Sequence, residues 1–599
     1  MAGPRRRLWR LRYPSDEEPV ELYLRTVGEA HLAPVATRVE LAEGGVALFD
    51  TYFNAFSVSK WLRHTTLRGV ELQIETRGDL RLEVVHDRLD LPSAVVAAAE
   101  VDSSELVAHQ LTLPPLAELA SGSMYLRATC RGGCATVTDA AWCTRDVPSR
   151  EARFGIVITT FNRPDDVRAN VMRLLDALTK HRSGGSRPEV VVVDNGQNLD
   201  LGDFAGDPIT VLSNPNTGGA GGFARGLMHL RATGRVTHVV FMDDDVAFDP
   251  DIVFRTVEVL SFARDPLLCV AGTMLDRAAP TTLFEAGAQF LGTSVNPHRA
   301  LGQSLDLARW RDCLRAECDD ERIDYGAWWF FAFPIELTHD NPIPAFVRGD
   351  DVCWGLLHAR NRIVTFNGIG LWHEGFELKN GPMAWFYETR NFALVSVLAV
   401  PGYRWWHLLA RYVQLCFRSL VSLKYASAAN ITFGMREFLR GPQHWLSIDQ
   451  EALNERVKAF EGERVELLSD ELTQVEPMRV RRGMRRYTNA SLSVALLGGH
   501  LLPRTLDRKP LRAVPIQQRL LGTAPGNEAI LYRDSSARFG FVARRDRRRF
   551  FGLLREMIRT AARIPWVFER LKRRYRDAYP QMVSDEYWTA QLTVHDRNR

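Results

Sequence analysis

The chain has 599 residues, of which 46% are hydrophobic and 25% charged, and its formal net charge is +4. This length is too great for one hydrophobic core and predicts two to four domains of an ordinary soluble globular protein. A net charge so close to zero gives no support to nucleic-acid binding. Eight cysteines in so long a chain do not indicate a disulfide framework, and neither a secretion signal nor an apolar run of membrane-spanning length is visible.

Residues 1–150 have the pattern of a β-rich N-terminal domain. Two segments that alternate apolar and polar residues, "VELQIET" and "LRLEVVH", flank Gly78, which predicts a hairpin. A third segment, "SMYLRATCRGGCATVTD", repeats this pattern around Gly132 and Gly133. Short strands separated by turn residues are typical of a β-sandwich or jelly roll, and we expect this domain to bind or pack, not to catalyse.

Residues 151–400 alternate strands and helices, as in an α/β domain. The apolar strands "FGIVITTF", "EVVVVDNG", "ITVLSN" and "THVVFM" are separated by helices, one from Pro164 to about Lys180 and another from about Gly222. This alternation predicts a parallel sheet covered by helices on both faces. Ligands of such sheets bind beyond the carboxyl ends of the strands, where nearly all the candidate polar residues of this chain occur.

Residues 401–599 predict a mainly helical, basic region. The stretches 405–425 and 548–575 combine aromatic and aliphatic residues with arginines at helical spacing. Such helices can lie on anionic lipid. For the first stretch, a helical domain packed on the rest of the protein is at least as good an interpretation, whereas membrane contact is favoured for the second.

Three adjacent carboxylates, Asp243, Asp244 and Asp245, follow the buried strand "THVVFM". Neighbouring like charges repel, so a bound cation would explain them, and a solvated turn or a helix cap is the alternative. On an extended strand Asp243 and Asp245 point the same way. Together with a diphosphate they would form a hard oxygen site suited to Mg²⁺ or Mn²⁺. His373 follows another strand and could complete the site, although a lone histidine is more often structural.

The glycine-rich segment "NPNTGGAGGFARG", residues 214–226, joins a strand to a helix. Glycines let a backbone approach a phosphate, and a helix N-terminus favours the anion. The segment also fits the pattern G-x-G-x-x-A from Gly219, with an acid about twenty residues on, so an oxidoreductase with a dinucleotide cofactor is an alternative. That alternative ranks second, because the segment follows a later strand of the domain and the acid is one of three.

Two residue pairs further along the chain are also candidates. Trp328 and Trp329 lie in a strand-like run, where core packing is the usual role of aromatic residues and a platform for sugar stacking is the alternative. Asp350 and Asp351 open a helix, so one acid can cap it while the other is free to act as a general base.

In this order, the motifs resemble the polymerising galactofuranosyltransferases of the mycobacterial cell-wall galactan, inverting family 2 enzymes with the GT-A fold. The segment "DTYFNAF", residues 50–56, is similar to the N-terminal β-sandwich of that family. The resemblance extends over about residues 50–391. Its motifs are Thr159 to Pro164, Asp194, Asn216 to Gly222, Asp243 to Asp245, Trp328 with Trp329, Asp350 with Asp351, and Trp372 with His373.

The resemblance implies UDP-galactofuranose as the donor, a growing lipid-linked galactan as the acceptor and Mn²⁺ or Mg²⁺ as the cofactor. The basic helical stretch from Arg544 to Arg576 predicts a peripheral enzyme on the cytoplasmic face of the cell membrane, and a homo-oligomer is left open. The implied site consists of the metal ligands Asp243, Asp245 and His373, the catalytic base Asp351, the nucleotide-sugar residues Arg163, Asp194, Asn216, Gly219 and Asp244, and the acceptor residues Trp328, Trp329, Asp350 and Glu388.

The sequence departs from the family at two places. Glu388 stands where the mycobacterial pattern has a histidine, and the segment after His373 is unlike it. Both changes bear on the choice of sugar or linkage. Two alternatives therefore stay open, an inverting transferase that uses another UDP-sugar and a non-catalytic glycan-binding protein with a transferase fold.

Overall fold

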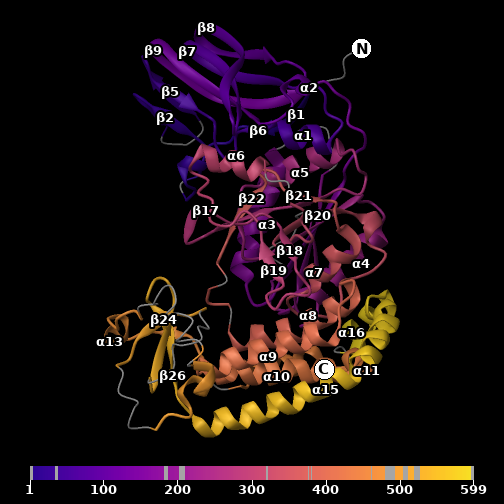
Figure 1. Cartoon of the computed structure of the whole chain (residues 1–599). Helices are drawn as coiled ribbons and strands as arrows, with labels where there is room; N and C mark the ends of the chain where they lie inside the picture. Colours follow the sequence, from indigo (N-terminus) through magenta and orange to yellow (C-terminus); the bar gives the residue numbers. More distant parts are fainter. Residues whose placement is uncertain are drawn as a thin grey trace.

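The computed structural model has three layers of structure along its long axis (Figure 1). An N-terminal sheet lies at one end, an α/β domain in the middle, and a layer of helices with a small sheet at the other end. The structure describes residues 5–594, except for residues 16, 34–37, 181–186, 201–208, 319–320, 376, 380, 461, 479–490, 492, 504–509 and 518–526.

The N-terminal sheet, expected from the sequence, is built on three long antiparallel strands. These are β7 (Glu71–Arg88), β8 (Leu91–Thr112) and β9 (Ser123–Thr144), and β7 lies between the other two. Six short strands complete the sheet, four of them paired directly with β9. They are β1 (Arg6–Arg10), β2 (Arg25–Val27), β3 (Ala30–Leu32), β4 (Val39–Ala42), β5 (Val46–Leu48) and β6 (Phe56–Ser57).

The hairpins predicted around Gly78 and Gly132–Gly133 are wrong, since both segments are continuous strands. The pairing register shifts at Gly78, whose φ of 97° and close approach to Ala135 suit a glycine in a β-bulge. A bulge adds one residue to a strand without reversing the direction of the chain. The two segments of alternating apolar and polar residues on either side of Gly78 therefore belong to one strand, β7. The partner strand β8 was not expected, because its mostly exposed residues give no clear apolar alternation.

The central sheet has seven strands in the order β12-β11-β10-β13-β20-β15-β21. The first four are parallel, which confirms the prediction for the strands named in the sequence, and β20, whose direction was not predicted, runs antiparallel to both of its neighbours. A buried apolar run has the same pattern in either direction, which is why the sequence did not reveal the reversal. The strands are β10 (Phe154–Thr160), β11 (Glu189–Asp194), β12 (Ile209–Ser213), β13 (His238–Asp243), β15 (Cys269–Ala271), β20 (Phe330–Pro334) and β21 (Ile363–Val364).

Helices and a second sheet surround the central sheet. The helices are α3 (Pro164–Lys180), α4 (Gly218–Thr233), α5 (Asp251–Ser261), α6 (Trp310–Cys318) and α7 (Asp350–Trp354). The second sheet has the order β14-β22-β16-β17, with β14 (Ala247–Phe248), β16 (Thr273–Asp276), β17 (Ala279–Glu285) and β22 (Gly370–His373), and a further pair is formed by β18 (Ala288–Phe290) and β19 (His298–Ala300). Because β14 follows β13 after three residues and pairs with β22, the end of β22 lies beside the end of β13.

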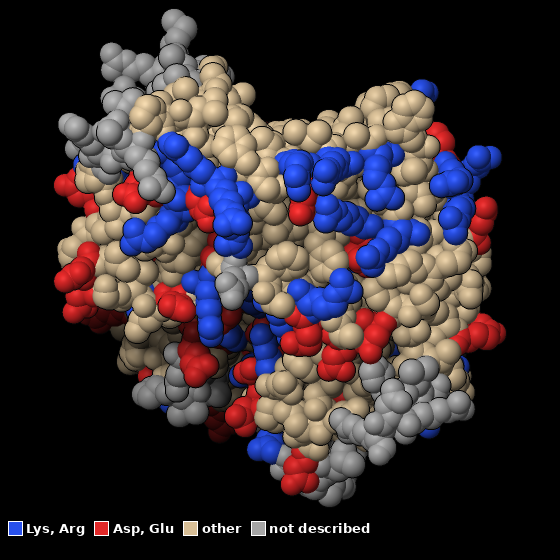
Figure 2. Space-filling model, turned by 90° about the horizontal axis from the view of Figure 1, so that it is seen from below, with Lys and Arg blue, Asp and Glu red and all other residues tan. Residues whose placement is uncertain are grey.

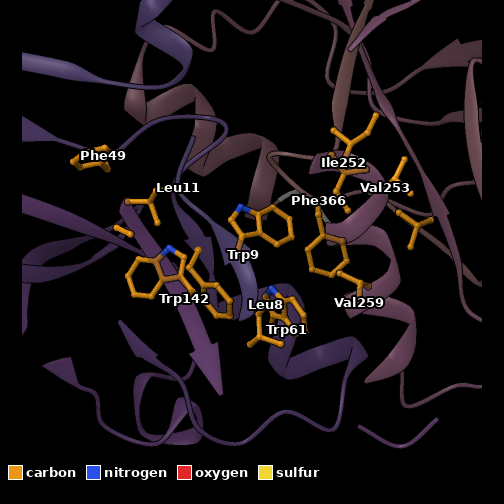
Figure 3. Packing of buried hydrophobic residues seen from close by; sticks show 14 of the residues in the cluster. Leu8, Trp9, Leu11, Phe49, Trp61, Trp142, Ile252, Val253, Val259 and Phe366 are labelled. Atoms are coloured by element: carbon orange, nitrogen blue, oxygen red, sulfur yellow. The ribbon is translucent and has the colours of Figure 1, made fainter. Parts of the chain in front are cut away.

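One continuous hydrophobic core joins the N-terminal sheet to the central domain (Figure 3). Trp9 of β1, Trp61 of α1 (Val58–His64) and Trp142 of β9 come from the N-terminal side, whereas Ile252 of α5 and Phe366 come from the central domain. All five are buried, and the rings of Trp61 and Phe366 lie 6.1 Å apart in an edge-to-face arrangement. The shared core fixes the two domains relative to one another.

The C-terminal third is mainly helical, as expected, with α8 (Pro382–Ala399), α9 (Trp405–Val421), α10 (Tyr425–Arg440), α11 (Pro442–Ser447), α12 (Gln450–Lys458), α15 (Arg547–Met582) and α16 (Asp585–Val594). It also contains an unpredicted sheet of β23 (Glu466–Leu467), β24 (Ala513–Pro515), β25 (Ala529–Arg533) and β26 (Phe539–Arg544). Among the described residues, no helix combines the length and apolar character needed to cross a lipid bilayer.

Replacing Gly226 of α4 by alanine should destabilise the central domain. A Cβ there would lie 2.3 Å from Cγ1 of Val157 in β10, so helix and strand would have to separate. Overpacking of this kind costs about 1–3 kcal/mol, which should lower the midpoint of denaturant unfolding. Gly552→Ala in α15 is the control, because no atom lies within 4 Å of its Cβ and alanine favours a helix by up to about 1 kcal/mol. Equal midpoints for the two variants would contradict this account of α4.

Candidate active site

The polar residues that follow the parallel strands meet at one edge of the central sheet. The register places Thr160 of β10 beside Asp194 of β11, and Thr159 beside Asp243 of β13. The carboxyl ends of these strands are therefore level, as expected for the ligand-binding edge of an α/β sheet.

Asp243, Asp245 and His373 come together there as a candidate divalent-cation site. One potential ligand atom from each lies within 4.8 Å of the others. His373 Nε2 is 3.1 Å from Asp245 Oδ1, and His373 Nδ1 donates a hydrogen bond to the carbonyl oxygen of Glu374 at 2.7 Å. Because that bond fixes Nδ1 as the protonated nitrogen, Nε2 is the one that faces the carboxylates, as in metal-binding histidines.

The three neighbouring acids differ in their electrostatic surroundings. Burial raises the pKa of Asp243 to about 7, with further contributions from Asp245 and Asp244 that His373 opposes. Burial also raises the pKa of Asp244 to about 6. Burial acts in the same direction on Asp245, but hydrogen bonds from His373 and Arg163, with the charge of Lys379, hold its pKa well below the usual value.

This donor set fits a divalent cation. Two carboxylates suit Mn²⁺ and Mg²⁺, and an imidazole is a common ligand of divalent transition metals; a bound dication would offset the burial and the mutual repulsion that raise the pKa of Asp243. Lys379 Nζ lies 3.1 Å from Asp245 Oδ2, and Arg163 forms ion pairs with Asp245 and, at 3.4 Å, with Asp244. These two cations neutralise part of the site, and no motif in the sequence pointed to Lys379.

Asp194 lies at the site, but its carboxylate is occupied by the backbone. Oδ1 accepts hydrogen bonds from the N–H groups of Gly196 and Gln197, and Oδ2 from those of Asn198 and Leu199, all at 2.9 Å. Nucleotide binding by Asp194 stays a prediction. Asp194 holds the loop after β11 in shape.

Most glycines of the segment 214–226 allow α4 to pack closely against neighbouring parts of the chain. Gly218 has a φ of 71°, and a Cβ there would lie 2.2 Å from the carbonyl oxygen of Phe346. A Cβ at Gly222 would lie 2.3 Å from Thr159, whereas none of the surrounding atoms lies within 4 Å of one at Gly219. Asn216 accepts a hydrogen bond from the N–H of Gly218 at 3.3 Å. Since α4 begins at Gly218, the G-x-G-x-x-A match lies inside the helix and not in the turn that a dinucleotide site requires.

The two acids of α7 are separated by their surroundings. Burial raises the pKa of Asp350 well above its usual value, and the charge of Asp351 adds to this. Burial also raises the pKa of Asp351, to about 6, helped by Glu285 and opposed by the N–H of Val352 at 2.8 Å and by His298. Asp351 is therefore the member that is ionised at neutral pH and still basic enough to take a proton.

A group of polar side chains that sequence reasoning missed lies around Asp351. Glu285 ends β17 in a buried position, and its Oε2 is 3.3 Å from Nε2 of His298 in β19. The other ring nitrogen of His298 is hydrogen-bonded to the hydroxyl of Tyr325. These residues have no motif of their own, because strands distant in sequence bring them to α7.

The predicted acceptor residues occupy two environments. Trp328 is 5% exposed and packs edge-to-face on Phe223 and Phe241, with ring centroids at 5.2 and 4.8 Å, which supports the core-packing interpretation for this residue. Trp329 is 4% exposed and donates to the carbonyl oxygen of Gly272, but its ring lies 6.3 Å from that of His373. Glu388 of α8 accepts a hydrogen bond from Arg348 at 2.5 Å. Acceptor binding by these residues stays a prediction.

Comparisons with known proteins agree along the chain. Residues 8–145 match the N-terminal domain of galactofuranosyltransferase 2, residues 155–286 match glycosyl transferase family 2, and residues 536–594 match domain 3 of galactofuranosyltransferase 2. Galactofuranosyltransferase GlfT2 of Mycobacterium tuberculosis is 28% identical over 640 residues, covering 98% of this chain and 97% of that enzyme. GlfT2 of Mycolicibacterium smegmatis is 26% identical over 611 residues, covering 94% and 91%.

A similar solved structure is that of residues 1–349 of TarS from S. aureus, with 13% identity, a TM-score of 0.30 and coverage of 53% of this chain and 94% of that one.

The fold, the acidic strand-edge site and the family 2 match define a glycosyltransferase of the GT-A type. Two of the matched stretches, residues 8–145 and 536–594, correspond to domains of galactofuranosyltransferase 2, and the chain is similar to enzymes of that name over nearly its whole length. The oxidoreductase and non-catalytic alternatives are thereby excluded.

Replacing His373 by alanine should weaken Mn²⁺ binding at least tenfold, because one of three protein ligands is lost. Binding to the wild type should also tighten between pH 6 and pH 8, since the cation must displace the proton that Asp243 holds with a pKa of about 7. Electron paramagnetic resonance of free Mn²⁺ measures both effects. His31→Ala is the matched control, because His31 is exposed in the N-terminal sheet. Unchanged Mn²⁺ affinity in His373→Ala would remove this residue from the site.

Proposed function

We propose that the chain transfers galactofuranose from UDP-galactofuranose to a growing galactan, with inversion at the anomeric carbon. The observation that carries the proposal is the meeting of Asp243, Asp245 and His373 at the sheet edge, close enough to share one cation, in a chain that matches two domains of galactofuranosyltransferase 2. The relatives that span nearly the whole chain carry the name galactofuranosyltransferase, which supports the sugar.

On the donor side, Asp243, Asp245 and His373 would hold Mn²⁺ or Mg²⁺. When bound, the ion would supply positive charge to the diphosphate of the leaving UDP. Arg163 already lies against Asp244 and Asp245 and would hold a diphosphate oxygen beside them. The other predicted donor residues would shape the backbone of the site. Asp194 holds the loop after β11 through hydrogen bonds to its N–H groups. Asn216 and Gly219 would leave the N-terminal end of α4 accessible to the nucleotide-sugar.

On the acceptor side, Asp351 would accept the proton of an acceptor hydroxyl. The oxygen then forms its bond to the anomeric carbon while the bond from that carbon to UDP breaks, and the electron pair leaves with UDP. Attack from the face opposite the leaving group inverts the centre in one step and needs no covalent intermediate. Asp350, Trp329 and Glu388 are the proposed acceptor contacts, and Trp328 would support them from the core.

Incubation with UDP-galactofuranose and a short galactofuranoside acceptor, followed by mass spectrometry, tests the donor and the reaction together. We expect products that grow by successive hexose additions, and none when UDP-glucose replaces the donor. Growth with UDP-glucose alone would overturn the choice of sugar and favour the alternative UDP-sugar.

Asp351→Asn is the matched test of the proposed base. It keeps the shape of the side chain but cannot take up a proton, so transfer should fall by about 10²–10⁴-fold while UDP and Mn²⁺ binding hold. In the wild type, kcat/KM should rise with pH through about 6, because the base acts only when deprotonated, and this limb should disappear in the variant. Asp350→Asn should cost less, since burial raises the pKa of Asp350 well above its usual value and disfavours the ionised form that a base needs. A fully active Asp351→Asn would place the base elsewhere.

We also propose that α15 holds the enzyme to the cytoplasmic face of the cell membrane, where a lipid-linked acceptor would be reached. Figure 2 shows lysine and arginine side chains gathered on the face seen from below, the side on which α15 lies in Figure 1. Along α15, Arg555, Arg559 and Arg563 are exposed, and Trp566 is 88% exposed. Each such cation contributes about 1 kcal/mol near an anionic surface. The formation of a homo-oligomer stays a prediction made from the sequence alone.

Trp566→Ala combined with Ile558→Ala should weaken flotation with anionic vesicles about tenfold, because two exposed apolar side chains of α15 are lost. Deletion of α15 would be a poor test, since Phe550, Ile564 and Tyr575 of this helix are fully buried. Leu467→Ala with Val147→Ala is the control, as both of these residues are exposed and neither belongs to α15. Equal flotation of both double variants would contradict membrane contact by α15.

A further inference from the structure

A cavity of about 920 Å³ lies where the small C-terminal sheet meets the start of α15. Five of its lining residues are arginines from a single six-residue segment: Arg544, Arg545, Arg547, Arg548 and Arg549. We call it the arginine pocket. It belongs to the C-terminal third, whereas the acids of the candidate active site follow strands of the central sheet.

The arginines of the pocket come from rigid elements, which limits how far they can spread apart. Arg544 ends β26 and Arg547 begins α15, so the segment turns sharply between a strand and a helix. Arg545 donates to the carbonyl oxygen of Asn527 at 2.6 Å, and Arg547 donates to that of Leu502. Guanidinium groups held close together repel, and a bound anion would relieve that repulsion.

Three acids also line the pocket, Glu463, Glu528 and Asp546, so its five arginines outnumber its carboxylates by two. Asp546 caps α15 by accepting a hydrogen bond from the N–H of Arg549 at 2.9 Å. Glu463 accepts hydrogen bonds from the N–H and the hydroxyl of Ser427. Within the part of the chain that the structure describes, neither Arg544 nor Arg548 forms an ion pair with a carboxylate.

We propose that the arginine pocket binds a phosphate monoester or a diphosphate group. Arginine forks pair with phosphate oxygens through two parallel hydrogen bonds, and several arginines around one cavity match a ligand with more than one negative charge. Tyr425 and Phe541 supply ring surface to the same cavity, so the ligand has room for an organic substituent beside its phosphate. The group comes either from a dissolved compound or from a lipid headgroup. The pocket is independent of the proposed transfer reaction.

Isothermal titration of the full-length protein with inorganic pyrophosphate tests the site. EDTA is present throughout, so that the active-site acids hold no cation to attract the probe. We expect saturable binding that Arg544→Gln with Arg548→Gln weakens at least tenfold. Arg555→Gln with Arg559→Gln removes the same charge from exposed positions of α15 outside the pocket and should change the affinity less than twofold.

The absence of saturable pyrophosphate binding to the wild type, or equal weakening by the two double variants, would overturn the proposal. Phosphatidylcholine vesicles with and without phosphatidic acid then assign the source of the group. Competition with pyrophosphate by the phosphatidic acid vesicles alone assigns a lipid headgroup, and no competition assigns a dissolved phosphate compound. Transfer to a short soluble acceptor by Arg544→Gln with Arg548→Gln should equal that of the wild type, which separates this site from the catalytic one.

Discussion

Electrostatic repulsion among Asp243, Asp244 and Asp245 is the constraint around which the central domain is arranged. Placing three carboxylates at the end of a buried strand raises the pKa of two of them, and positive partners must come from elsewhere. His373 arrives from the second sheet and Arg163 from the start of α3, while Lys379 precedes α8. Because each partner belongs to a different segment, the acids and their counter-charges bring four parts of the chain to one edge of the sheet, where a cation would offset the remaining negative charge.

The close approach of α4 to β10 sets the geometry of that edge. Glycines at positions 222 and 226 allow the helix axis to come nearer to Thr159 and Val157 than any side chain would permit. The helix therefore begins level with the strand ends, and its first turn is beside the acids. A sequence rich in glycine before a helix is usually taken as a phosphate loop, yet in this chain most of the glycines serve packing, and Gly219 alone among the four in positions 218, 219, 221 and 222 has open space at its Cβ.

Much of the central domain was predictable from local pattern. The strand–helix alternation, the helix from Pro164 to Lys180 and the meeting of Asp243, Asp245 and His373 followed from apolar runs and from the polar residues after them. The antiparallel β20 and the strand β8 were not predictable, because strand direction and pairing depend on distant partners. For the same reason Glu285, His298 and Lys379 escaped notice, since no spacing in the sequence connects them to the acids that they modify.

The packing of α16 on α4 has a consequence for biosynthesis. Arg231 of α4 pairs with Asp585, 354 residues further along the chain, and Trp588 of α16 donates to the carbonyl oxygen of Pro342 at 3.0 Å. Domains generally fold in the order in which the ribosome releases them. The helix that borders the candidate active site thus lacks its outer cover until α16 has emerged, and a chain halted after the central sheet would expose apolar surface to chaperones and proteases.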